Sequence, residues 1–343
     1  MALLLRNHEI RGLMTMPDYI AAVEEGYREV GLSQGAAFPR ENLWIEGEAD
    51  PDVRGGHLRS GSRASFKFKA ALLPGLGGAG VQAYTAGLGR GLETYMFLFD
   101  ARSGALAAVM EVLYYDWLKT AAVAAVAADY LAPVASRVVA LFGTGRHARS
   151  QLYGLMEVRS LERVQAYSRN PEARQAFCEK MTAELGIEVV AAASPVEALQ
   201  GADIVTTITT SPTPVFDNTM LPATPLHINA MGAHYPWVRE IDEQTVVGSR
   251  VFVDEMKQGL QEQGEILIPL AAGRIDDAHV VGDLGAVVAG RVIGREPESR
   301  WTLFLSGGTG VEDVAVATRL VERAREMGVG TEFAFQQPYE FEL

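Results

Sequence analysis

From Arg137 onward, short apolar runs alternate with helix-forming segments, and no other feature of the sequence restricts the possible folds as strongly. Repeated units of this kind place apolar strands in a parallel sheet whose two faces are covered by helices. The expected strands are 137–143, 163–168, 187–192, 203–209, 226–232 and 250–255, and the expected helices are 146–158, 171–185 and 195–200. This part of the chain is therefore predicted to form a doubly wound α/β domain.

The first part of the chain has a different pattern. Apolar residues at helical spacing predict a helix over 15–33, with Pro17 near its start. Between 38 and 115, glycine and proline divide short strand-like runs, and "LFDARSGAL" has the form of a hairpin. These residues predict an α+β region with a largely antiparallel sheet.

Two further helices connect these parts. The segment "DWLKTAAVAAVAADYLA" (116–132) leads into the alternating region, and the amphipathic helix 310–328 is expected to pack back on the first region. A chain of 343 residues is long for a single core. We therefore expect two domains, one made of residues 1–117 and 312–343 and the other of residues 118–311.

Composition excludes several classes of protein. The net charge of −13 argues against nucleic-acid binding, because phosphate contacts need a basic face. Cys178 is the single cysteine, which rules out an intramolecular disulfide, and the six histidines lack the spacing of zinc ligands, so we expect no metal. The opening "MALLLRNHEIRG" is too short for a signal peptide, and no later segment has the length of a spanning helix. We expect a cytoplasmic protein without a membrane partner.

A glycine motif follows the first strand of the alternating region. In "VVALFGTGRHARSQL", Gly143-x-Gly145-x-x-Ala148 stands between an apolar strand and a helix, which is the context of a dinucleotide-binding turn. Gly143 permits the tight turn, and Gly145 lets the backbone approach a pyrophosphate at the positive end of the helix. The other loop residues expected beside the cofactor are Thr144, Arg146 and His147.

The end of the second strand bears on the choice of cofactor. An acidic residue there binds the ribose 2′-hydroxyl of NAD and repels the 2′-phosphate of NADP. This strand ends in Ser168 and Arg169, with Arg146 as a second nearby cation and no carboxylate. The sequence favours NADP(H), with NAD(H) as the alternative.

Six segments occur in a characteristic order: "DWLKTAAVAAVAADYLA", "VVALFGTGRHARSQL", "VQAYSRNPEAR", "GADIVTTITTSPTPVF", "INAMGAHYPWVREID" and "TLFLSGGTGVEDVAVA". Together they resemble the ornithine cyclodeaminase/mu-crystallin family over almost the whole chain. The resemblance implies a Rossmann-type nicotinamide domain, and a substrate domain made from the N-terminal part and the last helix that usually forms a homodimer. Members include cyclodeaminases, reductases of imines, amino-acid dehydrogenases and an NADPH-dependent hormone-binding crystallin.

The resemblance also implies residues that bind a small imino or amino acid. Arg40 in "FPREN" matches an arginine that grips the substrate carboxylate. Gln82 in "GVQAYT" stands where the family has a lysine. Lys67 and Lys69 alternate with phenylalanines, so both lie on one side of a strand. Either one of these lysines supplies the cation that Gln82 lacks, or both belong to a solvated face. Lys119 replaces the arginine of an "RTAA" element, and Thr120 follows it.

Other segments should line the nicotinamide, because open α/β sheets bind ligands at the carboxyl ends of their strands. The residues expected there are Thr94, Thr207, Thr209, Ala230, Met231, Gly232 and Ser306, with Gly307 beside the substrate. Thr309 and Glu312 have the spacing of a capping box for the last helix, which we interpret as an ordinary amphipathic helix.

His234 follows "NAMGA", where the cyclodeaminases carry an aspartate that acts as acid and base. It either supplies a proton, since histidine titrates near neutrality, or only lines the pocket. The favoured hypothesis is an NAD(P)H-dependent reductase of an imine next to a carboxylate, or the reverse amino-acid dehydrogenase. A cyclodeaminase-type lyase is disfavoured by His234 and Gln82, and a crystallin-like binding protein is the third hypothesis.

Overall fold

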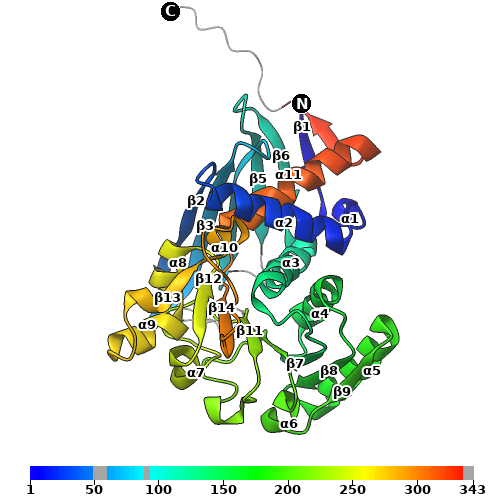
Figure 1. Ribbon diagram of the computed structural model, residues 1–343. Helices are drawn as coiled ribbons and strands as arrows, with labels where there is room; N and C mark the ends of the chain where they lie inside the picture. Colours follow the sequence, from blue (N-terminus) through cyan, green and yellow to red (C-terminus); the bar gives the residue numbers. More distant parts are fainter. Residues whose placement is uncertain (49–59, 89–92, 335–343) are drawn as a thin grey trace, which may run out of the picture.

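A computed structural model describes residues 1–48, 60–88 and 93–334, which form two sheets with their helices (Figure 1). The larger sheet has eight parallel strands in the order β13-β12-β14-β11-β10-β7-β8-β9. Its strands are β7 (Val138–Phe142), β8 (Arg163–Tyr167), β9 (Glu188–Ala191), β10 (Ile204–Thr207), β11 (Leu226–Ala230), β12 (Arg250–Val253), β13 (Val280–Asp283) and β14 (Trp301–Leu305). The expected doubly wound parallel sheet is confirmed.

The three helices expected between these strands are confirmed as α4 (Arg146–Val158), α5 (Pro171–Leu185) and α6 (Pro195–Leu199). Further helices between them were not expected: α7 (Glu243–Val247), α8 (Met256–Glu262), α9 (Gly264–Ala271) and α10 (Leu284–Val288). The sequence pattern gave no expectation for α7 to α10, β13 or β14. These elements have only four to eight residues, too few to establish a clear period.

Strand order in this sheet creates a crevice beside β7. The chain passes from β7 to β8 and β9 on one side, and then returns to β10 on the other side of β7. The carboxyl ends of β7 and β10 therefore flank a topological switch point, which is where open α/β sheets bind ligands.

The smaller sheet has the order β15-β1-β6-β5-β4-β3-β2, and its strands from β2 to β6 are antiparallel, as expected. Its strands are β1 (Ala2–Leu5), β2 (Ala36–Glu46), β3 (Ser62–Leu73), β4 (Gly78–Ala86), β5 (Thr94–Asp100), β6 (Leu106–Glu111) and β15 (Thr331–Phe333). The short α1 (Asn7–Ile10) follows β1. The hairpin at "LFDARSGAL" joins β5 to β6.

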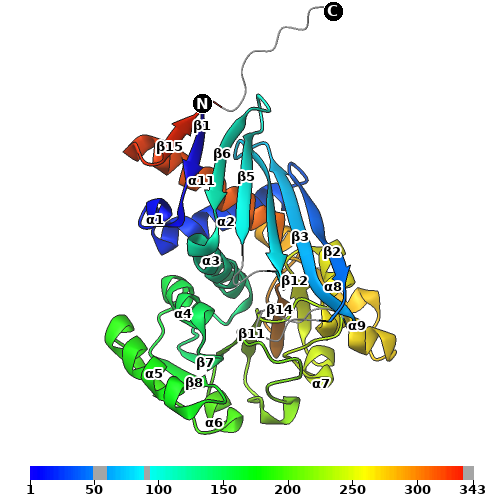
Figure 2. The same ribbon diagram turned by 180° about the vertical axis from the view of Figure 1, so that it is seen from behind.

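Helices cover only one face of this sheet. The helices α2 (Met16–Gly31) and α11 (Gly310–Met327) pack against each other and α11 lies on β2 to β5, whereas the opposite face is open to view in Figure 2. The Lys67 and Lys69 side chains of β3 point to the covered face and are 2% and 5% exposed, while Phe66 on the open face is 41% exposed. The solvated-face interpretation of these two lysines is wrong, because both side chains are buried on the covered face, where Lys69 pairs with Asp313 of α11.

The alanine-rich helix α3 (Leu113–Leu131) joins the two halves of the molecule. It packs on α2 of the first region and on α4 of the second, and small side chains allow the close approach. The predicted domain limits at 117–118 and 311–312 stay a prediction, since α3 contacts both halves. No helix in the described ranges is long and apolar enough to cross a membrane.

The contact between α3 and α4 should be sensitive to a single methyl group. A Cβ atom added at Gly154 of α4 would lie 2.7 Å from the Ala121 carbonyl oxygen of α3, so one backbone must move. We expect Gly154→Ala to lower the free energy of unfolding by about 1–3 kcal/mol despite the better helix propensity of alanine. Urea denaturation measures this effect, and Glu157→Ala on the exposed side of α4 is the control. Equal stability of wild type and Gly154→Ala would contradict this close packing.

Candidate active site

The glycine turn after β7 has the geometry that a pyrophosphate needs. Gly143 has a φ of +103°, and a Cβ there would lie 2.6 Å from the Ile208 carbonyl oxygen just beyond β10. Gly145 is the N-cap of α4, and a Cβ at this position would meet no described atom within 4 Å. The backbone therefore faces open space at the positive end of a helix, which fits a dinucleotide phosphate.

The end of β8 lies directly beside this turn. Thr144 Oγ1 and Ser168 Oγ are 2.9 Å apart, so the two hydroxyls join the turn to the second strand. Arg174 of α5 donates to the Ser168 carbonyl oxygen at 2.5 Å, and its guanidinium lies 5.4 Å from the centre of the Tyr167 ring. Arg146 and Arg169 are exposed at the same edge, where they are available to a ligand.

A buried carboxylate that the sequence gave no reason to select organises the ends of β10 and β11. Glu240 is fully buried and accepts hydrogen bonds from the Thr207 hydroxyl at 2.8 Å, the Thr209 amide at 2.7 Å and the Gly232 amide at 2.7 Å. Burial raises the pKa of Glu240, and these donors partly offset the effect. The Thr207 hydroxyl thus serves this network, and Ala230 and Met231 are buried beside it.

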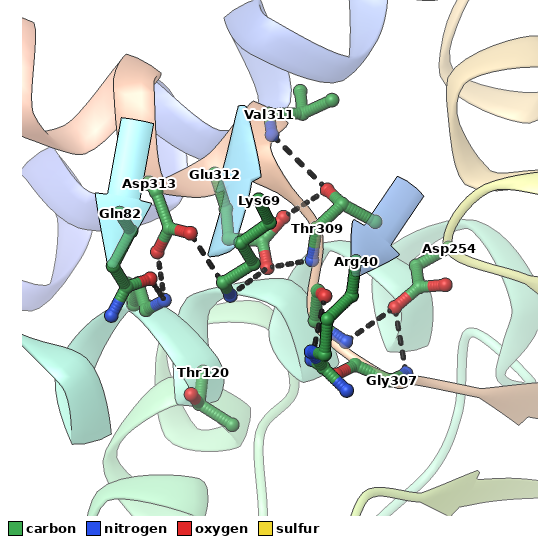
Figure 3. Close-up of polar contacts among 12 residues, drawn as sticks. Arg40, Lys69, Gln82, Thr120, Asp254, Gly307, Thr309, Val311, Glu312 and Asp313 are labelled. Carbon is green, nitrogen blue, oxygen red and sulfur yellow. Dashed lines mark hydrogen bonds and ion pairs between the residues drawn. The ribbon is translucent and has the colours of Figure 1, made fainter. Parts of the chain in front are cut away.

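Three residues expected near the substrate meet at one carboxylate of α11 (Figure 3). Lys69 Nζ lies 2.9 Å from Asp313, and Lys119 Nζ forms an ion pair with the other oxygen of the same group. With its amide nitrogen turned toward Asp313, Gln82 donates to both oxygens at 2.5 and 2.7 Å. The interpretation of the last helix as ordinary amphipathic helix is wrong at Asp313, which is fully buried and neutralises two lysines.

The capping box of α11 lies beside this ion cluster. The Thr309 amide donates to Glu312 Oε1 at 2.5 Å, and the Val311 amide donates to Thr309 Oγ1 at 3.1 Å, which confirms the predicted cap. Lys69 Nζ is 3.9 Å from Glu312. The cap therefore adds negative charge to the surroundings of Lys69.

Arg40 is held in a second cluster, in which Gly307 was expected but Glu262 and Gly308 were not. Its side chain is 4% exposed, Nη1 lies 3.2 Å from Glu262, and Nη2 donates to the Gly308 carbonyl oxygen at 2.9 Å and also to that of Gly307. Nε is buried and has no hydrogen-bond partner among the described residues. A buried guanidinium with one unused donor is suited to a carboxylate ligand.

The loop after β14 carries these carbonyl groups and is tied to Asp254. One carboxylate oxygen of Asp254 accepts from the Gly307 and Gly308 amides at 2.7 Å each and from the Ser306 hydroxyl at 3.2 Å (Figure 3). Burial raises the pKa of Asp254 to about 7. A Cβ at Gly308 would lie 3.3 Å from Lys69 Nζ and 3.5 Å from Arg40 Nη2, so both cations converge on this loop.

A fourth cation of the site belongs to the same strand as Lys69. Lys67 Nζ contacts the Tyr235 hydroxyl and lies 4.5 Å from the centre of the Tyr235 ring. His234, half-buried, has its ring centre 4.4 Å from that of Tyr235. The structure thus places His234 beside an aromatic residue that contacts the buried cation Lys67.

Of the remaining expected residues, Thr94 begins β5, and its hydroxyl is buried without a hydrogen-bond partner among the described residues. Thr120 Oγ1 donates to the Asp116 carbonyl oxygen at 2.7 Å, and Figure 3 shows its side chain apart from the ion cluster. Burial lowers the pKa of His147 in the glycine turn, and Asp116 opposes this shift. In the described ranges, no three His, Cys, Asp or Glu side chains are grouped as metal ligands.

Known proteins share both the fold and the sequence pattern. The family model described as ornithine cyclodeaminase/mu-crystallin family matches residues 70–328. Iminosuccinate reductase of Paracoccus denitrificans is 32% identical over 340 residues, which cover 96% of this chain and 99% of that protein.

Two solved structures show how closely the fold agrees. The Δ1-pyrroline-2-carboxylate reductase of Thermococcus litoralis, in complex with NADH and L-proline, is 30% identical with a TM-score of 0.86, covering 96% of this chain and 100% of that one. An archaeal alanine dehydrogenase dimer with bound NAD is 28% identical with a TM-score of 0.86, covering 98% and 99%. The expected Rossmann-type fold and the expected family are both confirmed: the chain belongs to the ornithine cyclodeaminase/mu-crystallin family.

Proposed function

We propose that this protein is an NAD(P)H-dependent oxidoreductase that reduces the C=N bond of a small imino acid, or oxidises the corresponding amino acid. The observation that carries the proposal is the convergence of Arg40 and Lys69 on the loop at Gly308. Two buried cations at one point fit the carboxylate of such a substrate. The relatives described above act on substrates of this kind.

The chain's own residues provide binding and orientation. Arg40 Nε, which has no hydrogen-bond partner among the described residues, would donate a hydrogen bond to a carboxylate oxygen, while Glu262 and the Gly307 and Gly308 carbonyl groups keep the guanidinium in place. The turn from Gly143 to Gly145 would hold the pyrophosphate of a nicotinamide dinucleotide, whose reduced ring would supply the hydride for the C=N carbon.

A cofactor-oxidation assay tests this function directly. Pyrroline-2-carboxylate, piperideine-2-carboxylate, and pyruvate with amines should each be offered with NADH and with NADPH. Oxidation with at least one of them is expected. Background rates with all of them would reject the reductase and favour a crystallin-like binding protein, whereas ammonia release from ornithine without net cofactor use would identify a lyase.

Arg40→Lys should separate carboxylate recognition from the rest of the reaction. Lysine keeps the charge but loses Nε and the planar fork, so we expect kcat/KM for the imino acid to fall by about 10–100-fold, mainly through KM. Steady-state kinetics measure the change. Arg63→Lys, at an exposed arginine of β3, is the matched control. An unchanged KM in Arg40→Lys would exclude Arg40 from substrate binding.

We further propose that the nucleotide site prefers NADPH. Ser168 and Arg169 follow β8 without a carboxylate, and Arg146 is exposed at the same edge. These cations would attract a 2′-phosphate, although the two solved relatives described above hold NADH and NAD.

Arg169→Ala tests this preference. We expect the KM for NADPH to rise by about tenfold, because one charge-assisted contact is lost, while the KM for NADH stays nearly constant. Cofactor titrations at fixed imino acid provide the measurement. If the wild type prefers NADH and Arg169→Ala changes both KM values equally, the preference for NADPH is rejected.

The open face of the smaller sheet supports a homodimer. This face carries exposed apolar side chains from β2, β3 and β5, which lie close together in the sheet. Such a group of apolar side chains is typical of interaction surfaces. The side chains are Phe38 and Leu43 of β2, Phe66 and Leu72 of β3, and Tyr95, Phe97 and Phe99 of β5. We propose that a second copy of the chain covers this face, as an archaeal relative is a dimer.

A charge in the centre of this face should weaken association. Phe97 is 38% exposed, and we expect Phe97→Asp to produce monomers at micromolar concentration because the aspartate would be buried without a partner. Light scattering after size-exclusion chromatography gives the mass. Val134→Asp, at an apolar residue 91% exposed on the other half of the chain, should leave the dimer intact. A wild-type monomer, or a Phe97→Asp dimer, would overturn the proposal.

A further inference from the structure

One buried cation of the site has no role in the function proposed above. Lys67 is 2% exposed and lies on β3, two residues before Lys69, on the same face of the sheet. Lys69 and Lys119 share the carboxylate of Asp313. In the part of the chain that the structure describes, no carboxylate forms an ion pair with Lys67, whose contact is the Tyr235 hydroxyl.

The surroundings of Lys67 come from four elements of both halves of the molecule. Arg40 faces it from β2 and Tyr84 from β4, with the Tyr84 ring centre 5.7 Å from Nζ. Glu262 faces it from α8, and Tyr235, with His234 beside it, from the loop after β11. Burial, followed by repulsion from Arg40, lowers the pKa of Lys67 to about 7, and Glu262 partly opposes this. Lys67 therefore changes between ammonium and amine near neutral pH.

The position of Lys67 matches that of a proton donor. Its Nζ lies among the groups that surround Arg40, the residue proposed to hold the substrate carboxylate. Tyr235 reaches it from the loop that follows β11, and the carboxyl end of β11 belongs to the ligand-binding edge of the parallel sheet. If the carboxylate of an imine contacts Arg40, its nitrogen would therefore lie between the residues of the smaller sheet, including Lys67, and the carboxyl ends of the parallel strands.

We propose that Lys67 is the catalytic acid that protonates the imine nitrogen, and that Tyr235 is the positioning residue that accepts a hydrogen bond from its ammonium group. This inference rests on the proposed reductase function. An N–H bond of the ammonium breaks and an N–H bond to the imine nitrogen forms. The iminium carbon then accepts the hydride from the reduced nicotinamide, and water returns a proton to the Lys67 amine. His234 lies next to Tyr235 and needs no direct part in this step.

Two substrates separate proton donation from binding. Pyrroline-2-carboxylate needs a proton on nitrogen, whereas its N-methyl iminium analogue already carries the positive charge. With Lys67→Met, we expect kcat for the imine to fall by about 100-fold or more, and kcat for the iminium to change by less than about threefold. Lys67→Arg keeps the charge but retains its proton, so KM should stay near the wild-type value while kcat for the imine falls. Lys180→Met, at an exposed lysine of α5, is the matched control.

The pH profile gives a second measurement. Only the ammonium form donates, so wild-type kcat/KM for the imine should fall as the pH rises through about 7, and the iminium should lack this dependence. Tyr235→Phe removes an acceptor that favours the charged lysine, so the fall should move to lower pH. Without turnover, calorimetry in buffers of different ionisation enthalpy should detect proton uptake when pyrrole-2-carboxylate binds, and Lys67→Met should abolish that uptake.

The outcomes distinguish this inference from the proposed function. A wild type that oxidises neither cofactor with either substrate contradicts the reductase function and, with it, the role of Lys67. A wild type that reduces the imine supports the function, and three results would then overturn the role of Lys67. In Lys67→Met, these are an equal fall in kcat for the imine and the iminium, and unchanged proton uptake on binding of pyrrole-2-carboxylate. In Lys67→Arg, it is a wild-type kcat for the imine.

Discussion

The candidate site depends on one buried carboxylate, that of Asp313. It neutralises Lys69 from a strand and Lys119 from α3, and without it two ammonium groups would face each other away from water. Because α11 carries this carboxylate, the last long helix in the described part of the chain completes a cluster whose nearer lysine, Lys119, lies 194 residues earlier. Loss of the Asp313 charge would therefore disturb binding and folding together.

The cations of the site are matched by buried carboxylates, with one exception among the described residues. Arg40 is matched by Glu262, and Lys69 and Lys119 are both matched by Asp313. These matched cations suit fixed binding roles, since changing one partner leaves the other charge buried and unpaired. Lys67 lies among aromatic rings instead, which is the environment of a group that changes its protonation state.

Local patterns predicted the elements with a clear period, but not the long-range partners. The strand β7, its glycine turn and α4 were recognisable because a continuous apolar run, two glycines and helical spacing follow one another over residues 138–158. By contrast, Glu240, Asp254, Glu262 and Asp313 looked like ordinary surface acids, since acidic residues in loops and helices are usually exposed. These acids are buried because of the way distant elements pack together. The spacing of residues along the sequence gives no information about that packing. The alternation in "FKFK" gave the correct two faces of β3, but the choice of the inner face depended on Asp313 of a helix far along the chain.

Strand order has a consequence for the synthesis of this protein. The strand β14 lies between β11 and β12, although it is the last of the eight in sequence, and β15 pairs with β1 at the start of the chain. A ribosome that has released every residue up to β13 has therefore produced a parallel sheet with a gap in its centre and a first strand without one of its neighbours. Neither sheet is complete before β14 and β15 emerge, so folding of the two halves is coupled to the synthesis of these two late strands.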